Sequence, residues 1–343
     1  MREATRRTEA LQPVSVVLAI PIDVNQSDGA AKPAAGFMRP APLRLSLSGA
    51  GFLGSYHLGV GRALQGRLEQ PATVVAGASA GAIVGAVLVT ATPIEAARAS
   101  LQALVAHTLA APLGVLTPGF SLVDAVRDEL SARLPSDAHR LASGRLHIAL
   151  TSLRPGELGR IHYKSAYGSR DELIDAVSAS SDIPGFTGRL RAGALSGRGG
   201  GPVAGGHTDR QTVWQRLTGK SDVDGGLFDI FPDPWRGQLP ATTFVSPFAG
   251  VGFAIAPHRT PGSPLVPTWS PLQSTVPETG RTVELSARNA GRWRDAFFPP
   301  SNAAVLRYED EGFEAAAAWL GAEEARSSGE APGPATAAVH SDA

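Results

Sequence analysis

The chain has 343 residues, no cysteine and a formal net charge of zero, with 31 basic and 31 acidic side chains. This length suits one large domain or two ordinary ones. The lack of cysteine excludes disulfides and a cysteine nucleophile, and the balanced charge gives no reason to expect a nucleic-acid partner. The eight histidines lack the spacing of metal ligands, so we expect neither a metal nor another cofactor.

Residues 1–42 mix arginine, glutamate, glycine, alanine and proline, and we expect them to form a poorly ordered N-terminal extension. They do not show the pattern of a secretory signal. A transit peptide stays open as an interpretation, with Glu3, Glu9 and Asp23 counting against it. We find no stretch in the chain with the length and apolar character of a membrane span.

A strand is expected at residues 43–48, where apolar and polar side chains alternate, followed by the glycine-rich run GAGFLG at 49–54 and a helix at 55–68. A glycine-rich loop that opens a helix presents unpaired backbone N–H groups, which can hold a phosphate or a developing oxyanion. The G-x-G-x-x-G spacing also fits dinucleotide binding, which requires an acid at the end of a second strand. Glu69 has a suitable offset but ends a helix, so we disfavour that interpretation.

A second strand is expected at 73–76, and the pentad GASAG at 77–81 separates it from an apolar helix at 80–90. A serine in G-x-S-x-G between a strand and a helix is typical of a nucleophile whose hydroxyl is exposed at the helix N-terminus. The same pentad also arises by chance in a chain rich in glycine and alanine, where it marks only a close-packed junction.

Further elements alternate along the chain and predict an α/β fold with a largely parallel central sheet. The expected strands are 146–152, 159–163 and 241–246, and the expected helices are 94–108, 122–134, 171–178 and 309–320. Both glycine turns follow strands, so they are expected side by side at the carboxyl edge of the sheet. Residues 188–220 are rich in glycine and are expected to form an inserted surface loop, and residues 322–343 a disordered tail.

The third motif is Asp224 followed by two glycines, within residues 222–226. A carboxylate beside two glycines has little steric cover and can approach another loop closely. An Asp-Gly turn is also common in proteins without any active site, so this motif decides nothing by itself.

In this order, the three motifs resemble the patatin-like phospholipase family, and more closely its animal-type branch of adipose triacylglycerol lipase-like and adiponutrin-like proteins. The resemblance extends over about residues 43–321 and includes the stretches 116–123, 142–151, 178–186, 245–248 and 297–300. It implies a three-layer patatin-like sandwich and one acyl hydrolase domain at 43–321. Two features depart from the family: Leu53 stands where many members carry a basic residue, and 188–220 has no clear counterpart.

The resemblance implies a serine acyl hydrolase that cleaves carboxylic esters of lipids, such as triacylglycerols or phospholipids, through a Ser-Asp dyad and an acyl-enzyme. Transacylation would follow where an alcohol replaces water. By motif match, Ser79 is the nucleophile, Asp224 completes the dyad, and the oxyanion hole falls on Gly49, Ala50 and Gly51. The motif-supporting glycines are Gly54, Gly77, Gly81, Gly225 and Gly226. The resemblance also suggests that residues 183–186 line the acyl crevice.

A Ser-Asp-His triad with His258 is the alternative within hydrolases. We favour the dyad because the glycine loop and the Asp-Gly-Gly motif fit it. An ordinary aspartate is a weak base for a serine hydroxyl, so the dyad predicts that Asp224 is buried and has a raised pKa. His57, in the first turn of the first helix, is expected to be a packing or surface residue.

A different class of function is a catalytically weak protein of the same fold that binds lipid droplets or membrane surfaces. The intact Ser79 and Asp224 count against it. We expect a cytoplasmic protein in peripheral contact with lipid droplets or membranes, with residues 110–116 as a candidate contact and organelle targeting left open. The sequence leaves open the substrate lipid, the chain length, any protein co-activator and the oligomeric state.

Overall fold

The computed structural model describes residues 43–188, 219–227, 229–238, 240–267 and 280–328. The chain separates into two units, residues 1–40 and 41–343, and everything described below belongs to the second. The expected N-terminal extension, most of the glycine-rich insertion (189–218) and the last fifteen residues of the expected tail (329–343) lie outside the described residues.

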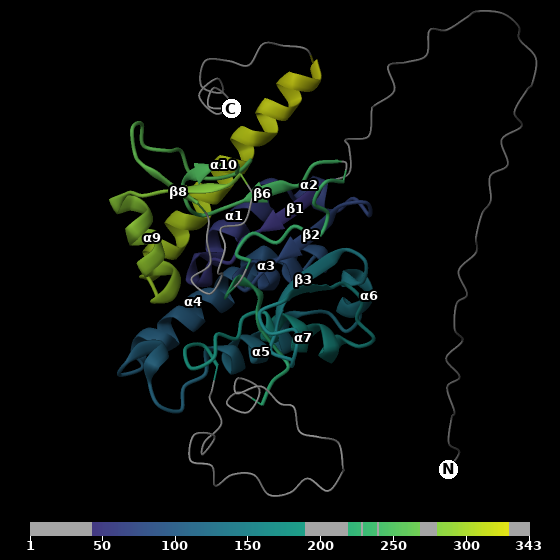
Figure 1. The fold of residues 1–343 in the computed structure, drawn as a ribbon, viewed down its shortest axis with the longest axis vertical. Helices are drawn as coiled ribbons and strands as arrows, with labels where there is room; N and C mark the ends of the chain where they lie inside the picture. Colours follow the sequence, from purple (N-terminus) through teal and green to yellow (C-terminus); the bar gives the residue numbers. More distant parts are fainter. Residues whose placement is uncertain (1–42, 189–218, 228, 239, 268–279, 329–343) are drawn as a thin grey trace, which may run out of the picture. The chain divides into compact units, whose positions relative to one another are not determined.

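The central sheet has the strand order β4-β3-β2-β1-β6 (Figure 1). Its strands are β1 (Arg44–Leu47), β2 (Val74–Gly77), β3 (Leu146–Ser152), β4 (Ile161–Lys164), β5 (Asp222–Asp224), which also pairs with β3, and β6 (Thr243–Val245). The β1–β2, β2–β3 and β1–β6 pairs are parallel, whereas β4 and β5 run antiparallel to β3. A separate small sheet has the order β7-β9-β8 and contains β7 (Gly250–Val251), β8 (Leu265–Pro267) and β9 (Thr282–Glu284). The predicted α/β sandwich with a largely parallel sheet is confirmed.

The helices follow the predicted ranges in the first half of the chain and depart from them at the end. They are α1 (Gly54–Ala63), α2 (Gln65–Leu68), α3 (Ala80–Val89), α4 (Ile94–Ala110), α5 (Leu122–Arg133), α6 (Ala138–Ala142), α7 (Arg170–Ala179), α9 (Ala287–Phe297) and α10 (Asn302–Ser328), with 3-10 turns η1 (Gly51–Leu53), η2 (Gly114–Leu116) and η3 (Gly225–Leu227). The sequence analysis did not predict α9, and it was wrong to begin the tail at residue 322, because α10 continues to Ser328. Alanine and glutamate, which dominate this end of α10, favour helix.

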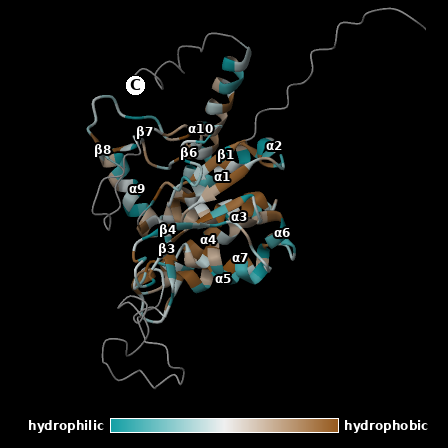
Figure 2. Cartoon of the chain, turned by 45° about the vertical axis from the view of Figure 1, so that its right-hand side comes forward, coloured by the Kyte–Doolittle hydropathy of each residue, from teal (hydrophilic) through white to brown (hydrophobic). Residues whose placement is uncertain are grey.

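The hydrophobic core lies between the sheet and the helices packed on it. Leu45, Val75 and Ile148 point from neighbouring strands into this core, and α3 is apolar along its length (Figure 2). The opposite face of the sheet is covered by the segment after η3. There the Ser46 hydroxyl donates to the Pro232 carbonyl at 2.7 Å.

Helices α1 and α10 pack backbone to backbone. A Cβ atom at Gly59 of α1 would overlap the Glu309 carbonyl, and a Cβ at Gly312 of α10 would overlap the backbone of α1. Next to this crossing, the buried Glu309 carboxylate accepts from Arg62 at 2.9 Å and from Arg98 of α4 at 2.5 Å. The last helix is thereby tied to the first and to α4.

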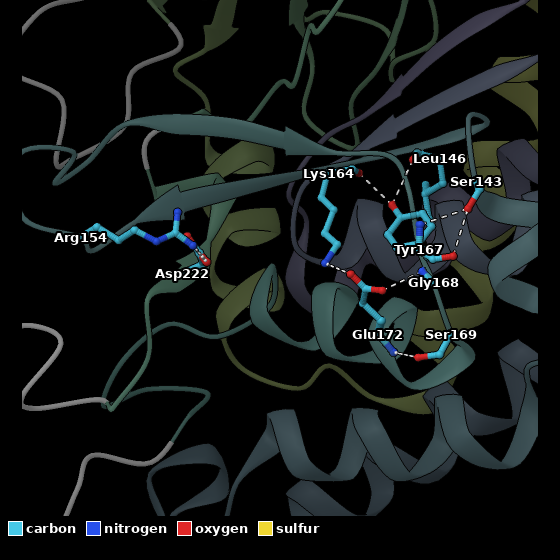
Figure 3. A network of polar contacts seen from close by, with 9 residues as sticks. All are labelled: Ser143, Leu146, Arg154, Lys164, Tyr167, Gly168, Ser169, Glu172 and Asp222. Atoms are coloured by element: carbon cyan, nitrogen blue, oxygen red, sulfur yellow. Dashed lines mark hydrogen bonds and ion pairs between the residues drawn. The ribbon is translucent and has the colours of Figure 1, made fainter. Parts of the chain in front are cut away.

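A polar network fixes the edge of the sheet (Figure 3). Lys164, at the end of β4, donates to Glu172 of α7 at 2.6 Å, and the Tyr167 hydroxyl donates to the Lys164 carbonyl at 2.8 Å. At the other end of the β3–β4 pair, Arg154 donates to Asp222 at 2.9 Å. This last contact holds the first residue of β5 beside the end of β3.

Candidate active site

Ser79 occupies a strained turn between β2 and α3. Its φ of 53° and ψ of −125° lie in a region that residues other than glycine rarely adopt. A Cβ at Gly77 would overlap the backbone of Gly81, and a Cβ at Gly81 would overlap the Leu47 carbonyl of β1. The pentad therefore requires both of its glycines, and the turn has the geometry of a nucleophile elbow.

Ser180, which the sequence analysis did not single out, supports this turn through hydrogen bonds. The Ser79 N–H donates to the Ser180 hydroxyl oxygen at 3.0 Å, and that hydroxyl donates to the Ala149 carbonyl at 2.8 Å. Ser180 is fully buried at the end of α7. The strained turn is thus tied to the neighbouring strand β3 by a single side chain, and the only sequence signal for it was the family-like stretch 178–186.

The sheet register brings Asp224 close to the turn that carries Ser79. Gly77, the last residue of β2, lies opposite Ile148, and Asp224, the last residue of β5, lies opposite Leu150. Leu150 and Thr151 of β3 pair with β4 on one edge of the strand, and the same two residues pair with β5. Strand β5 must therefore lie on the other edge of β3, where β2 also pairs. The ends of the two strands therefore meet about 7 Å apart along β3.

Asp224 is held on all sides. Its carboxylate, in a residue that is 2% exposed, accepts from the Gly226 N–H at 2.6 Å and lies near enough to the Ser79 side chain for that hydroxyl to favour its charged form. Its own N–H donates to the Asp182 carbonyl at 3.1 Å, and the Thr151 hydroxyl donates to its carbonyl at 2.8 Å. The structure thus places the two residues of the predicted pair near each other at the ends of neighbouring strands.

The electrostatics of Asp224 follow from this position. Burial raises its pKa to about 7, because a carboxylate loses its hydration there, while the hydrogen bonds from Ser79 and Gly226 offset part of the rise. The predicted burial and raised pKa are confirmed. A carboxylate with a pKa near neutrality is ionised for much of the time at neutral pH and is a stronger base than an exposed aspartate.

The glycine loop lies directly against the nucleophile. A Cβ at Gly49 would come within 3.8 Å of the Ser79 Cβ. However, the Gly49 N–H already donates to the Ile230 carbonyl at 2.9 Å. The assignment of Gly49 as an oxyanion donor therefore needs correction, because its N–H is already hydrogen-bonded to the segment after η3. Gly49 instead leaves space beside Ser79, since it has no side chain.

Ala50 and Gly51 stand where free donors are expected. They lie at the start of η1, where the first N–H groups of a helical turn have no partner within the turn. Gly51 has a φ of 53°, and a Cβ there would overlap the Ala296 carbonyl of α9. Only glycine fits this point, where the loop, η1 and α9 meet.

The remaining motif glycines allow close packing around the site. A Cβ at Gly225 would overlap the Ala149 carbonyl of β3, and one at Gly226 would lie 3.0 Å from the Asp224 carboxylate. Gly54, the first residue of α1, packs against α3. Gly225 and Gly226 are therefore constrained by the backbone and the carboxylate of the site, whereas a Cβ at Gly54 would make only ordinary contacts with side chains of α3.

The two histidines considered in the sequence take no part in the pair. His57 is fully buried, and its Nε2–H donates to the Ser48 carbonyl at 2.9 Å. Burial lowers its pKa to about 4, so it is neutral, as a packing residue should be. His258 is exposed, its carbonyl accepts from Arg288, and within the described residues its ring makes no recorded contact with Ser79.

Within the part of the chain that the structure describes, no cluster of three histidine, aspartate or glutamate side chains is arranged to hold a metal ion. In the same residues, no helix has the combination of length and apolar sequence that crossing a membrane would require.

Residues 45–232, more than half of the chain, match the family model "Patatin-like phospholipase". Patatin-like phospholipase domain-containing protein 2 of Rattus norvegicus is 32% identical over 280 residues, which are 81% of this chain and 50% of that protein. The chain spans about half the length of this protein and of its counterparts in mouse, human and cattle.

Two further relatives differ in the share of their own length that aligns with this chain. Patatin-like phospholipase domain-containing protein 4 of Homo sapiens is 29% identical over 276 residues, 79% of this chain and 94% of that protein. The 1-acylglycerol-3-phosphate O-acyltransferase Pnpla3 of Mus musculus is 36% identical over 209 residues, 60% of this chain and 44% of that protein. With all three motifs inside the matched residues, this chain belongs to the patatin-like phospholipase family, in its animal-type branch.

Proposed function

We propose that this chain is a serine acyl hydrolase that cleaves the carboxylic esters of lipids through a dyad of Ser79 and Asp224. One observation carries the proposal: a serine on a strained turn lies beside a buried carboxylate, and burial raises the pKa of that carboxylate to about 7. Family membership supports lipid ester hydrolysis at a coarser level, without specifying a substrate.

In the proposed first step, Asp224 accepts the proton of Ser79 while the serine Oγ attacks the ester carbonyl carbon. The N–H groups of Ala50 and Gly51 hold the oxyanion of the tetrahedral intermediate. Loss of one such donor typically costs about 2.7–4 kcal/mol of transition-state stabilisation. The bond to the alkoxy group then breaks, the alcohol leaves with the proton from Asp224, and the acyl group stays on Ser79.

In the second step, water attacks the acyl-enzyme with Asp224 as the base, which releases the fatty acid and restores Ser79. A lipid alcohol in place of water gives transacylation by the same route. The relative named as an O-acyltransferase supports testing this branch. The measurement is the partition of one acyl donor between free acid and new ester as a lipid alcohol is added.

The proposal includes contact with a lipid surface through an apolar rim, which we define as Leu109, Leu113, Leu116, Phe297 and Phe298. All five are large and exposed, Leu113 by 64%. The Phe186 ring joins the two parts of the rim, since it lies 5.8 Å from the Phe297 ring and packs against the hydrophobic cluster that contains Val115 of η2. Phe297 follows directly on the residue that touches Gly51, so the rim borders the glycine loop.

The rim is tested by flotation of the protein with triacylglycerol droplets coated with phospholipid. Leu113→Asp and Phe298→Asp should weaken binding, because each places a charge in the rim, and should leave hydrolysis of a water-soluble acetate ester unchanged. Leu141→Asp is the matched control, since Leu141 is an exposed leucine of α6, ahead of the N-terminal end of β3. Equal binding by all three variants would exclude the rim as the contact.

The hydrolase is tested with purified protein on emulsified triacylglycerol, phosphatidylcholine and galactolipid. Activity should be lost in Ser79→Ala and retained in His258→Ala. If the wild type is no more active than Ser79→Ala but still floats with droplets, the chain is the catalytically weak binder instead. Loss of activity in His258→Ala would restore the triad.

A further inference from the structure

An apolar crevice of about 100 Å³ lies beside the turn that carries Ser79. Its floor is α3, its walls are α4 and α5, and one end is formed by Gly51 and by Ala80, the residue next to Ser79. A cavity with such a lining is unfavourable for water, which finds too few polar partners there. The crevice therefore suits an apolar ligand that reaches the glycine loop.

The floor of the crevice is one stripe of α3. Ala80, Ile83, Val84 and Val87 line it, and their spacing of three and four residues puts them on one face of the helix. From Ala80 to Val87 the stripe extends about 10 Å, at 1.5 Å per residue. The crevice is thus elongated and leads straight away from the reacting serine.

The far end of the crevice is polar. Ser100 of α4 donates to Glu129 of α5 at 2.5 Å, and Arg133 lies 3.6 Å from the same carboxylate. All three residues line the crevice, together with Thr92 in the turn before α4. Because α4 runs back along α3 from that turn, Ala97 in its first turn belongs to this far end, and Leu104 lies nearer the nucleophile.

We propose that this crevice holds the acyl chain of the ester, extended along α3, and that the side chains at positions 84 and 97 set the longest chain that is accepted. The inference rests on the proposed function. An alcohol or polar headgroup finds no partners along the apolar stripe, whereas a saturated or unsaturated hydrocarbon chain does. The polar bridge between Ser100 and Glu129 marks where burial of the hydrocarbon ends.

This placement differs from the expectation for residues 183–186. Those residues are not among the lining of the crevice. Phe186 packs instead against Phe297 and Phe298 at the apolar rim. Residues of α3 and α4 therefore set the accepted acyl length, and the 183–186 stretch belongs to the entrance of the crevice.

The test compares p-nitrophenyl acetate, butyrate, octanoate, laurate and palmitate. Val84→Phe fills the crevice one turn from the nucleophile and should lower kcat/KM for laurate and palmitate by at least about tenfold, since each buried methylene counts, with acetate unaffected. Ala97→Phe should lower kcat/KM only for the longest esters. Ala103→Phe is the control, because it adds the same ring to an exposed position of α4. An unchanged length profile in both crevice variants would overturn the inference.

A binding measurement keeps this test independent of catalysis. In Ser79→Ala protein, the fluorescent fatty acid cis-parinaric acid should bind with at least about tenfold lower affinity when Ala97→Phe is added, and with unchanged affinity when Ala103→Phe is added. Equal binding by both would overturn the inference even in an active enzyme. Failure of Ser79→Ala to abolish ester cleavage would instead refute the proposed function. Melting temperatures identify any variant that has not folded, and Ala97→Phe, at a half-buried position, carries the test if Val84→Phe does not fold.

Discussion

The Ser79 turn and strand β5 contribute one residue each to the proposed site, but they are held differently. The turn, residues 77–81, is continuous with β2 and α3 and is packed backbone to backbone against β1. The three-residue strand β5 depends on partners far along the chain, namely the Asp182 carbonyl, the Thr151 hydroxyl and Arg154. Local packing therefore positions the serine, and long-range contacts position the acid.

This difference has a consequence for mutations. A change in the turn meets main-chain atoms that cannot move aside, so it acts on the whole fold. A change around β5 removes a hydrogen bond or an ion pair and shifts one carboxylate by a small distance, so it acts first on activity. Five predictions test this contrast, from the largest expected effect to the smallest.

Gly81→Ala should abolish folding, because its methyl group would overlap main-chain oxygens of β1. The expected loss exceeds about 4 kcal/mol, the range of severe core defects. The matched control is Gly66→Ala in α2, where an added Cβ would have no neighbouring atom within 4 Å. This substitution should raise the free energy of unfolding by up to about 1 kcal/mol, because alanine favours helix more than glycine does. Soluble yield and thermal unfolding decide the outcome; a folded Gly81→Ala protein would contradict the assignment of rigidity to the turn.

Asp224→Asn should lower kcat by about 10²–10⁴-fold, the usual contribution of a general base. In the wild type, kcat/KM should rise with pH through about 7, where the free enzyme loses the Asp224 proton. The residual activity of the variant should lack this step. A wild-type profile that is flat between pH 5 and 8 would refute Asp224 as the base.

The same carboxyl group should affect stability in the opposite sense. Its pKa is raised in the folded state to about 7, above an unfolded value of about 3.9, so its contribution is full below pH 4 and is lost as pH rises to 7. Asp224→Asn should therefore melt at a higher temperature than wild type at pH 8, with the difference shrinking toward pH 4. Scanning calorimetry at both pH values measures it.

Ser180→Ala should have an intermediate effect, because it leaves the Ser79 N–H without its acceptor at the strained turn. The expected cost is about 1–3 kcal/mol of stability, with a fall in kcat larger than the change in KM. Ser178→Ala is the matched control: its buried hydroxyl has no hydrogen-bond partner among the described residues. Equal behaviour of the two variants would show that the tie from Ser180 does not hold the turn.

Arg154→Met should have the smallest effect. The ion pair with Asp222 is partly exposed, and such pairs contribute about 0–1 kcal/mol. We expect a decrease in kcat/KM of a few-fold at most, larger at high pH where Asp224 must stay in place as the charged base. Arg127→Met removes another exposed pair, with Asp175, and should leave activity unchanged. A steady-state assay of both variants in parallel suffices.

The sequence predicted the turn, the glycine loop and Asp224 because each is a short pattern whose residues are adjacent. It could not reveal that the Gly49 amide is committed to Ile230, since that bond joins distant segments. Helix α9 escaped prediction for a related reason: its buried face carries Asn289, Arg292 and Asp295, polar residues that sequence alone places at the surface. Tertiary hydrogen bonds, which satisfy these polar groups, leave no periodic signal in the sequence.

The contact of Gly59 with α10 determines how far the chain can be shortened. The match to the family model ends at residue 232, yet the first helix after the glycine loop rests on a helix that begins seventy residues later. A fragment that stops at the end of the match would bare the glycine face of α1 and leave Arg62 and Arg98 without their shared carboxylate. The smallest piece able to hold an active serine must therefore include α10.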